Sequence, residues 1–261
     1  MCRFLAWTGQ PRTLESLVLD PPFGLLRQSY APRRQKYGTV NADGFGVGWY
    51  SPSRPEPARY RTSQPLWSDE SFASIAGVIE SGCVLAGVRS ASVGMPVEVT
   101  ATAPFTDGRW LFGHNGFVPD ASVLRGLLPR GAVPESRVDS ALLWAMVSAQ
   151  LDAGRPAAAA VADIVTAVGE ATPGRMNLFL TDGEQLVASA WGDTLWVRET
   201  TDGVLVASEP DSENDADADA DADNEADSTD WHELHDRTLL IVEQGRITTS
   251  ALGGDPQEGA A

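Results

Sequence analysis

The sequence predicts an α+β fold, in which helices and strands occupy separate layers. Short strand-like stretches come first, two helical stretches follow in the middle of the chain, and further short strands come last. The clearest helix is Asp139–Leu151 (DSALLWAMVSAQL), where apolar residues recur at helical spacing and Asp139 occupies the cap position. This order favours packed layers over a doubly wound parallel sheet, in which strands and helices would alternate.

In the first half, strands are predicted where apolar residues alternate or run together between turn signals. The first ends at Gly9–Pro11, and Ser51–Pro57 is read as a Pro-rich turn. Ser29–Thr39 (SYAPRRQKYGT) is read as a polar, basic loop. The His-Asn-Gly that begins at His114 is read as a turn after a strand. The strands are predicted at Arg3–Trp7, at the end of Asn41–Tyr50, at Val84–Arg89 and at Trp110–Gly113, and the helices at Thr13–Leu19 and Ser71–Ser81.

In the second half, an Ala-rich helix is predicted over Ala157–Gly169. Four short strands separated by Asp-Gly or Gly-Asp turns are read as one meander, and Gln244-Gly245 is read as the turn of a final hairpin. These strands are Met176–Thr181, Gln185–Ala190, Leu195–Glu199 and Val204–Ser208, followed by the hairpin strands Thr238–Glu243 and Arg246–Thr249.

The charge of the chain is acidic and unevenly distributed. The formal net charge is −17, and the run Asp211–Asp230 holds ten Asp or Glu and no Lys or Arg, so −7 remains for the rest. This balance argues against nucleic-acid or anionic-membrane binding, which requires clustered Lys and Arg. The run is read as a disordered, solvated insertion, and no register of it supplies the Gly and Glu of a calcium loop.

The chain shows neither a linker nor an internal repeat, so a single domain over residues 2–261 is expected. No apolar run approaches the roughly 18 residues that a membrane span requires, and the N-terminus does not resemble a signal peptide. The two cysteines, Cys2 and Cys83, lie too far apart in sequence for a disulfide framework or zinc signature. A cytoplasmic protein with reduced thiols is expected.

Several common catalytic motifs are incomplete. The glycines at 44, 46 and 48 are spaced GxGxG rather than GxGxxG, and His232 and His235 lack the four-residue spacing of an HExxH zinc helix. No G-x-S-x-G nucleophile elbow occurs. Neither a cofactor nor a metal is expected.

A cysteine directly behind the start methionine has a chemical use. Removal of Met1 would place the α-amino group of Cys2 beside its own thiol, and an α-amine has an unperturbed pKa near 8. The amine, directly or through a water, could take the thiol proton and later return it to the leaving group. The structural alternative is that Cys2 is a small apolar residue at the start of a buried strand.

The opening MCRFLAWTG resembles the start of class II glutamine amidotransferases, whose nucleophile is an N-terminal cysteine. Four further stretches match that family in order: NADGFGVGWY, GVRSAS followed by APF, FGHNGFV, and SEP at 208–210. The resemblance covers roughly Cys2 to Pro210. It implies the N-terminal nucleophile (Ntn) hydrolase fold, a four-layer αββα sandwich of two face-to-face sheets with helices outside.

The resemblance also implies roles for particular residues. Cys2 would attack a γ-glutamyl carbonyl, with Asn115 and the backbone N–H of Gly116 as the oxyanion hole. Arg89 would bind the α-carboxylate of the glutamyl group, and Asp139 its α-ammonium. Two neighbours in the same motifs complete the candidate substrate-binding set: Ser90 and His114. Without the resemblance, Arg89 could be a surface ion-pairing residue and Asp139 simply a helix cap.

One position departs from the family pattern, because Gly87 stands where many relatives carry His. The glutaminase-like region fills nearly the whole chain, which leaves no room for an ammonia-acceptor domain. The resemblance is strongest to small stand-alone members that hydrolyse a γ-glutamyl amide of a hercynylcysteine sulfoxide in ergothioneine biosynthesis. The partner expected is therefore a small γ-glutamyl molecule.

Two alternatives stay open: a glutaminase subunit that delivers ammonia to a partner, and a non-enzymatic acidic binding module. Arg33, Arg34, Trp67 and the Tyr30–Tyr37 loop are candidates to line the leaving-group side. The sequence does not decide whether the chain forms a homo-oligomer.

Overall fold

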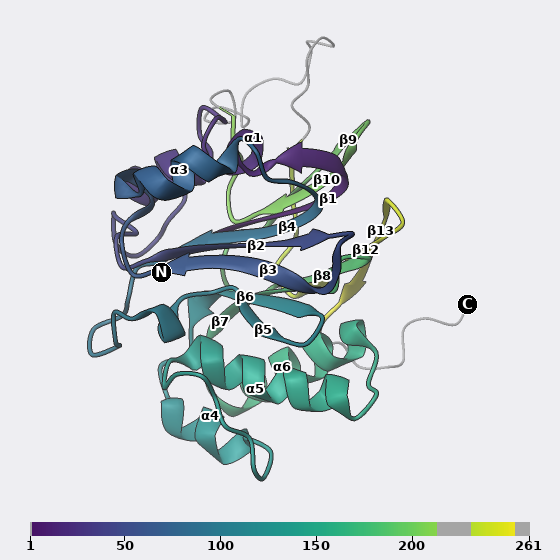
Figure 1. The fold of residues 1–261 in the computed structure, drawn as a ribbon. Coiled ribbons are helices and arrows are strands. Elements are labelled where there is room, and N and C mark those ends of the chain that lie inside the picture. Colours follow the sequence, from purple (N-terminus) through teal and green to yellow (C-terminus); the bar gives the residue numbers. More distant parts are fainter. Residues whose placement is uncertain (1, 213–230, 254–261) are drawn as a thin grey trace, which may run out of the picture.

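The computed structural model describes residues 2–212 and 231–253, which form four layers (Figure 1). Two antiparallel sheets lie face to face, and helices cover the outer face of each. The expected α+β class and αββα layering are therefore confirmed. None of the helices in this described part of the chain is long and apolar enough to cross a membrane.

The first sheet has seven strands in the order β11-β9-β10-β1-β4-β2-β3. Its central strand β1 pairs with β10 on one side and β4 on the other, so the N-terminal segment is fixed along both edges. The strands are β1 (Arg3–Thr13), β2 (Phe45–Ser51), β3 (Arg54–Thr62), β4 (Glu80–Val88), β9 (Trp196–Thr200), β10 (Gly203–Ala207) and β11 (Trp231–Glu233).

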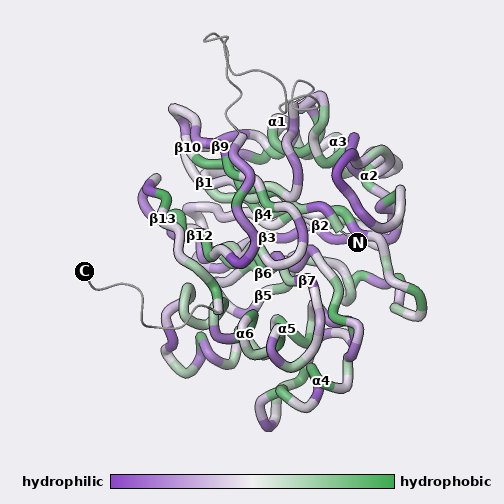
Figure 2. Tube along the Cα trace, turned by 180° about the vertical axis from the view of Figure 1, so that it is seen from behind, coloured by the Kyte–Doolittle hydropathy of each residue, from purple (hydrophilic) through white to green (hydrophobic). Residues whose placement is uncertain are grey.

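The second sheet has six strands in the order β13-β12-β8-β7-β6-β5. The expected final hairpin is present as β12 and β13, and its turn is hydrophilic (Figure 2). The strands are β5 (Phe105–Asp107), β6 (Trp110–Phe117), β7 (Arg175–Thr181), β8 (Gln185–Ala190), β12 (Thr238–Glu243) and β13 (Arg246–Ala251).

The helices divide between the two outer faces. The first sheet is covered by α1 (Leu14–Val18), α2 (Leu25–Tyr30) and α3 (Glu70–Ala76), and the second by α4 (Ala121–Leu127), α5 (Asp139–Asp152) and α6 (Ala157–Ala171). Two short 3₁₀ turns lie at Leu66–Ser68 and Val99–Ala101.

Apolar side chains form three buried clusters, one between each pair of adjacent layers. In the cluster between the sheets, Phe4 of β1 stacks on Phe179 of β7, with 5.4 Å between ring centroids. Gly87 and Gly113 make room for the Phe4 ring, because a Cβ at either position would lie 2.6 or 2.5 Å from it. The sheets can therefore approach closely beside the start of β1.

Three sequence expectations were wrong in detail. His-Asn-Gly is not a turn, because β6 runs unbroken through residues 114–116 and pairs with β7. The four strands after α6 are not one meander: β7 and β8 belong to the second sheet, and β9 and β10 to the first. Residues 54–57 begin β3 instead of forming a turn.

Other elements differ in length or were missed. β1 continues past Gly9 to Thr13, with a register shift between Thr8 and Arg12. The acidic insertion was expected to start at Asp211, but Asp211 is buried and pairs with Arg198. Most of that expected insertion lies outside the described residues. The short elements α2, α4, β5 and β11 were missed.

Candidate active site

Cys2 lies directly before β1, at the end of the gap between the two sheets. Its side chain is half-buried and packs against the inter-sheet cluster that contains Phe4. It lines a small pocket with residues from four other segments: Gly87–Arg89, Ala101–Ala103 with Phe105, His114 of β6, and Ser140 of α5. The thiol expected to be the nucleophile therefore opens onto a pocket built by both sheets.

Asn115 presents an unusual buried amide to the same gap. Side chains alternate along β6, and Leu111 belongs to the inter-sheet cluster, so Asn115 faces inward as well. Its exposed fraction is 0%, yet neither Oδ1 nor Nδ2 has a hydrogen-bond partner among the described residues. Buried amides are nearly always paired in folded proteins. This unpaired donor is what an oxyanion hole requires.

Gly116 follows in a position where no side chain fits. A Cβ there would lie 1.9 Å from the carbonyl oxygen of Arg175 and 2.6 Å from Nε2 of His114. The glycine is therefore needed for close pairing of β6 and β7, and not for the turn expected from the sequence. The backbone of Gly116, next to Asn115, is therefore not covered by a side chain of its own.

Arg89 is held at the end of β4 by the Asn-Ala-Asp-Gly turn. Its N–H donates to the carbonyl of Gly44, and its carbonyl accepts from the N–H of Asp43. Nη1 donates to the carbonyl oxygen of Asp43 at 3.4 Å, and the side chain is 8% exposed. Arg89 lines the Cys2 pocket, and a guanidinium suits a carboxylate ligand. Ser90, the next residue, lies outside that pocket lining and beside the loop at Gly38.

Asp139 is the first residue of α5, one position after the capping residue Val138. Its Oδ2 accepts from the N–H of Val118 at 3.0 Å, and Oδ1 accepts from the N–H of Ser140 at 2.8 Å. The carboxylate thus ties the start of α5 to the chain just after β6. It is 8% exposed, and its neighbour Ser140 lines the pocket.

His114 lines the Cys2 pocket, and both of its ring nitrogens have partners within the protein. Its Nε2 lies 3.0 Å from the carbonyl oxygen of Arg175, so it must donate, and Nδ1 lies 3.0 Å from Oγ of Ser140. A neutral imidazole that donates through Nε2 accepts through Nδ1. Both ring nitrogens are occupied, so His114 positions β6 against β7 and α5.

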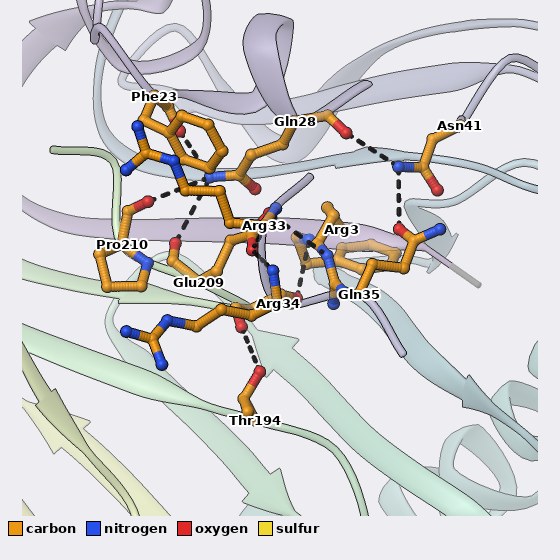
Figure 3. A network of polar contacts seen from close by, with 12 residues as sticks. Arg3, Phe23, Gln28, Arg33, Arg34, Gln35, Asn41, Thr194, Glu209 and Pro210 are labelled. Atoms are coloured by element: carbon orange, nitrogen blue, oxygen red, sulfur yellow. Dashed lines mark hydrogen bonds and ion pairs between the residues drawn. The ribbon is translucent and has the colours of Figure 1, made fainter. Parts of the chain in front are cut away.

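The late SEP segment fixes the residues that follow Cys2. Ser208 Oγ accepts from the N–H of Phe4 at 3.0 Å, and the N–H of Ser208 donates to the carbonyl of Phe4. Glu209 Oε1 lies 3.6 Å from Nε of Arg3, and both side chains are 1% exposed (Figure 3). This buried pair holds the nucleophile's strand to the end of β10.

Glu209 also holds the Ser29–Thr39 segment. Its Oε2 accepts from the backbone N–H of Arg34 at 2.6 Å and of Arg33 at 3.2 Å (Figure 3). Burial raises the pKa of the Glu209 carboxyl, and the charge of Arg3 and these N–H groups oppose that rise. Burial lowers the pKa of Arg3, opposed chiefly by Glu209.

The expected leaving-group residues are mostly used for packing. The guanidinium of Arg33 lies 3.7 Å from the ring centroid of Phe23, and that of Arg34 lies 4.7 Å from the Trp196 ring. The ring of Trp67 packs edge-on against Tyr30. None of these side chains belongs to the lining of the Cys2 pocket.

Comparison with known proteins adds independent evidence. The family model for class-II glutamine amidotransferases matches residues 16–258. The chain belongs to this family. Its relatives include γ-glutamyl-hercynylcysteine sulfoxide hydrolases of Mycobacterium tuberculosis strain H37Rv and Mycolicibacterium smegmatis. Both are 46% identical over 254 residues, which cover 97% of this chain and 97% or 100% of theirs.

Solved structures support the amidotransferase fold. A glutamine aminotransferase class-II domain protein from Silicibacter pomeroyi superposes with a TM-score of 0.63 at 22% identity, covering 97% of this chain and all of that one. Glutamine phosphoribosylpyrophosphate amidotransferase from Bacillus subtilis gives 0.65 at 13% identity, covering 98% of this chain and 50% of that one. The expected Ntn-type fold is thus confirmed.

Within residues 2–212 and 231–253, no three His, Cys, Asp or Glu side chains come together as ligands of a metal ion would. The sequence had not singled out Arg3, Phe4 or Arg175, yet Arg3 pairs with Glu209, Phe4 lines the Cys2 pocket, and the Arg175 carbonyl accepts from His114. The quoted SEP motif was the one available signal, because it marked Glu209, the partner of Arg3.

Proposed function

We propose that this chain is a γ-glutamyl amide hydrolase that uses Cys2 as its nucleophile. The observation that carries the proposal is the buried, unpaired amide of Asn115, which faces the gap where the Cys2 thiol lies. Arg89 lines the pocket at Cys2 and supplies a cation for the glutamyl α-carboxylate. The likeness to three curated hydrolases across 97% of the chain supports the same activity.

The reaction proceeds in two steps. With Met1 removed, the Cys2 amine accepts the thiol proton, and Sγ attacks the γ-carbonyl carbon of the substrate. Asn115 and the N–H of Gly116 stabilise the oxyanion, at on the order of 3 kcal/mol for each donor. The C–N bond then breaks, the leaving amine takes the proton, and a water hydrolyses the thioester to release glutamate and the free thiol.

We assign the substrate as γ-glutamyl hercynylcysteine sulfoxide, cleaved to glutamate and hercynylcysteine sulfoxide in ergothioneine biosynthesis. The assignment follows the relatives that carry this name. Arg89 and Asp139 serve the glutamyl half, with the Asp139 carboxylate facing the α-ammonium. Ser90 and His114 act around them, His114 by holding Asn115 in place through its bond to the Arg175 carbonyl.

The test is glutamate release from three substrates by the purified chain: γ-glutamyl hercynylcysteine sulfoxide, glutathione and glutamine. The sulfoxide should give the highest kcat/KM. Faster ammonia production from glutamine would instead indicate a glutaminase that supplies a partner, and absence of glutamate release from all three would indicate a binding protein.

An N-terminal extension tests the mechanism separately. It blocks the α-amine of Cys2 and should abolish activity, whereas intact mass should show that Met1 is absent from the active protein. A fully active extended protein would contradict the assigned base.

A further inference from the structure

Arg175 begins β7, directly beside the oxyanion strand. It pairs with Phe117, so its backbone runs next to Gly116. Phe179 of β7 belongs to the inter-sheet cluster, and alternation along the strand places Arg175 on that same inner face. The side chain of Arg175 therefore lies on the face that carries Asn115, at the open end of the strand.

The guanidinium of Arg175 is positioned but only partly used. Its Nε donates to Oδ2 of Asp193 at 2.9 Å, and its Cζ lies 4.5 Å from the ring centroid of Tyr37. Neither terminal nitrogen has a partner among the residues that the structure describes, and the side chain is 22% exposed. A planar fork with two open donors fits a carboxylate.

Tyr37 is held against this arginine from two sides. Its segment is fixed by the Glu209 carboxylate, which accepts from the backbone of Arg33 and Arg34. On the other side, a Cβ at Gly38 would lie only 3.8 Å from Oγ of Ser90, so the segment passes beside the residue after Arg89. The Tyr37 side chain remains 59% exposed. The stacked pair Tyr37–Arg175 thus forms a wall near the site that is open to a ligand.

We propose that Arg175 binds the α-carboxylate of the amino acid that leaves when the γ-glutamyl bond is cut, with Tyr37 fixing the plane of the guanidinium. This inference rests on the proposed function. In a γ-glutamyl derivative of cysteine, the scissile nitrogen is attached to the carbon that bears the carboxylate. That group therefore lies two bonds from the breaking C–N bond and accompanies the departing amine.

The consequence is selection of the leaving group. Ammonia, the leaving group of glutamine, carries no carboxylate and gains nothing from Arg175. An amino-acid leaving group gains a charge-assisted, bidentate contact. Arg175 therefore favours γ-glutamyl amino acids over glutamine without taking part in the covalent steps at Cys2.

The experiment compares two substrates in each variant: γ-glutamyl hercynylcysteine sulfoxide and the same compound without the cysteinyl carboxylate. Arg175→Met should lower kcat/KM for the first by about 10- to 100-fold, mainly through KM, and leave the second within twofold. Arg175→Lys should recover part of the loss. Both variants keep the backbone carbonyl of residue 175, which accepts the hydrogen bond from His114 Nε2.

Arg198→Met is the matched control, because Arg198 also pairs with an aspartate, Asp211, and stacks on an aromatic ring, Trp231. It should leave the ratio of the two substrates unchanged. Taking the ratio within one variant cancels any loss of folded protein. If Arg175→Met slowed the hydrolysis of both substrates equally, the inference about Arg175 would be overturned, but the proposed hydrolase function would stand. If the wild-type chain cut neither substrate, the proposed function itself would be overturned.

Discussion

The two cysteines of this chain have opposite surroundings: Cys2 directly precedes β1, and Cys83 lies on the neighbouring strand β4. Cys83 lies on β4 opposite Thr8 of β1, is fully enclosed, and has its Sγ 3.2 Å from Oγ1 of Thr181. Burial raises its pKa to about 12, so the thiolate is suppressed. Cys2 is half-buried at the end of the same sheet and opens onto a pocket with Arg89.

The two thiols share a residue type and differ in their surroundings. The polar groups around Cys83 are satisfied: Thr181 Oγ1 donates to the carbonyl of Gln185 as well as contacting the sulfur. In the gap between the sheets where Cys2 lies, the Asn115 amide has no partner among the described residues, a cost that a bound ligand would offset. On the proposed function, the end of the sheet is organised for a substrate, and its middle for packing.

The largest effect is expected from removal of the exposed thiol. Cys2→Ala deletes the nucleophile, so kcat for glutamate release should fall by at least about 1,000-fold. Thermal unfolding should change little, because the thiol is only half-buried. Activity within tenfold of the wild type would mean that the two cysteines do not differ in the way described.

The next effect concerns two cross-strand partners, Asn115 and Asn177. Asn115→Ala should lower kcat by about 100- to 1,000-fold, as loss of an oxyanion donor does, while stability is kept. Asn177 is equally buried but fully bonded: Nδ2 donates to the carbonyls of Asp193 and Thr194, and Oδ1 accepts from the N–H of Trp191.

Asn177→Ala is therefore the matched control. It should cost about 2–4 kcal/mol of unfolding free energy, because three buried bonds are lost. Denaturant unfolding and steady-state kinetics on both variants separate the two outcomes. If Asn115→Ala destabilised the fold as much as Asn177→Ala, its amide would be structural.

The residues proposed for catalysis lie in short, local motifs, so the sequence alone could suggest them. Cys2 was identified by its place in the chain, and Arg89, Asn115 and Gly116 by motifs that also resemble a known family. The reason for Gly116 was nevertheless wrong, because a His-Asn-Gly turn signal is overridden when a neighbouring strand pairs with it. Local sequence identified the residue but not the backbone conformation.

Elements that depend on tertiary context were missed. Pro55 and Pro57 suggested a turn, but β3 is the edge strand of its sheet, where an absent N–H donor is tolerated. The crossing from β8 to β9 leaves no local trace, since hairpins in different sheets look alike in sequence. Arg175 is brought beside Gly116 only through strand pairing, so no motif could reveal it.

A smaller effect tests how closely the sheets must approach at the active end. Gly113→Ala places a Cβ 2.5 Å from the Phe4 ring. Phe4 must then shift, which should cost about 1–3 kcal/mol of stability and lower kcat/KM by displacing Cys2. Gly126→Ala, in open space on α4, is the control and should stabilise by up to about 1 kcal/mol. Equal stability of the two variants would show that the two sheets are not tightly packed at Gly113.

The smallest effect is expected at the inert thiol. Cys83→Ala should keep kcat/KM within twofold and cost about 1 kcal/mol at neutral pH, because a buried sulfur and its contact with Thr181 are lost. At alkaline pH the difference in stability between the wild type and Cys83→Ala changes. The Cys83 thiol ionises near its ordinary value of 9.0 when unfolded but only at about 12 when folded. The stability it contributes is thus complete below pH 9 and is lost as the pH rises through 12.

Between those limits the wild type should lose up to about 1.4 kcal/mol of unfolding free energy per pH unit relative to Cys83→Ala. Urea unfolding of both proteins at pH 8, 9 and 10 measures that difference, and the loss should be steepest in the last interval. Parallel curves would mean that Cys83 ionises as readily in the folded chain as in the unfolded one. The middle of the sheet would then protect its thiol no better than the end does, and the low reactivity assigned to Cys83 would have no basis in its burial.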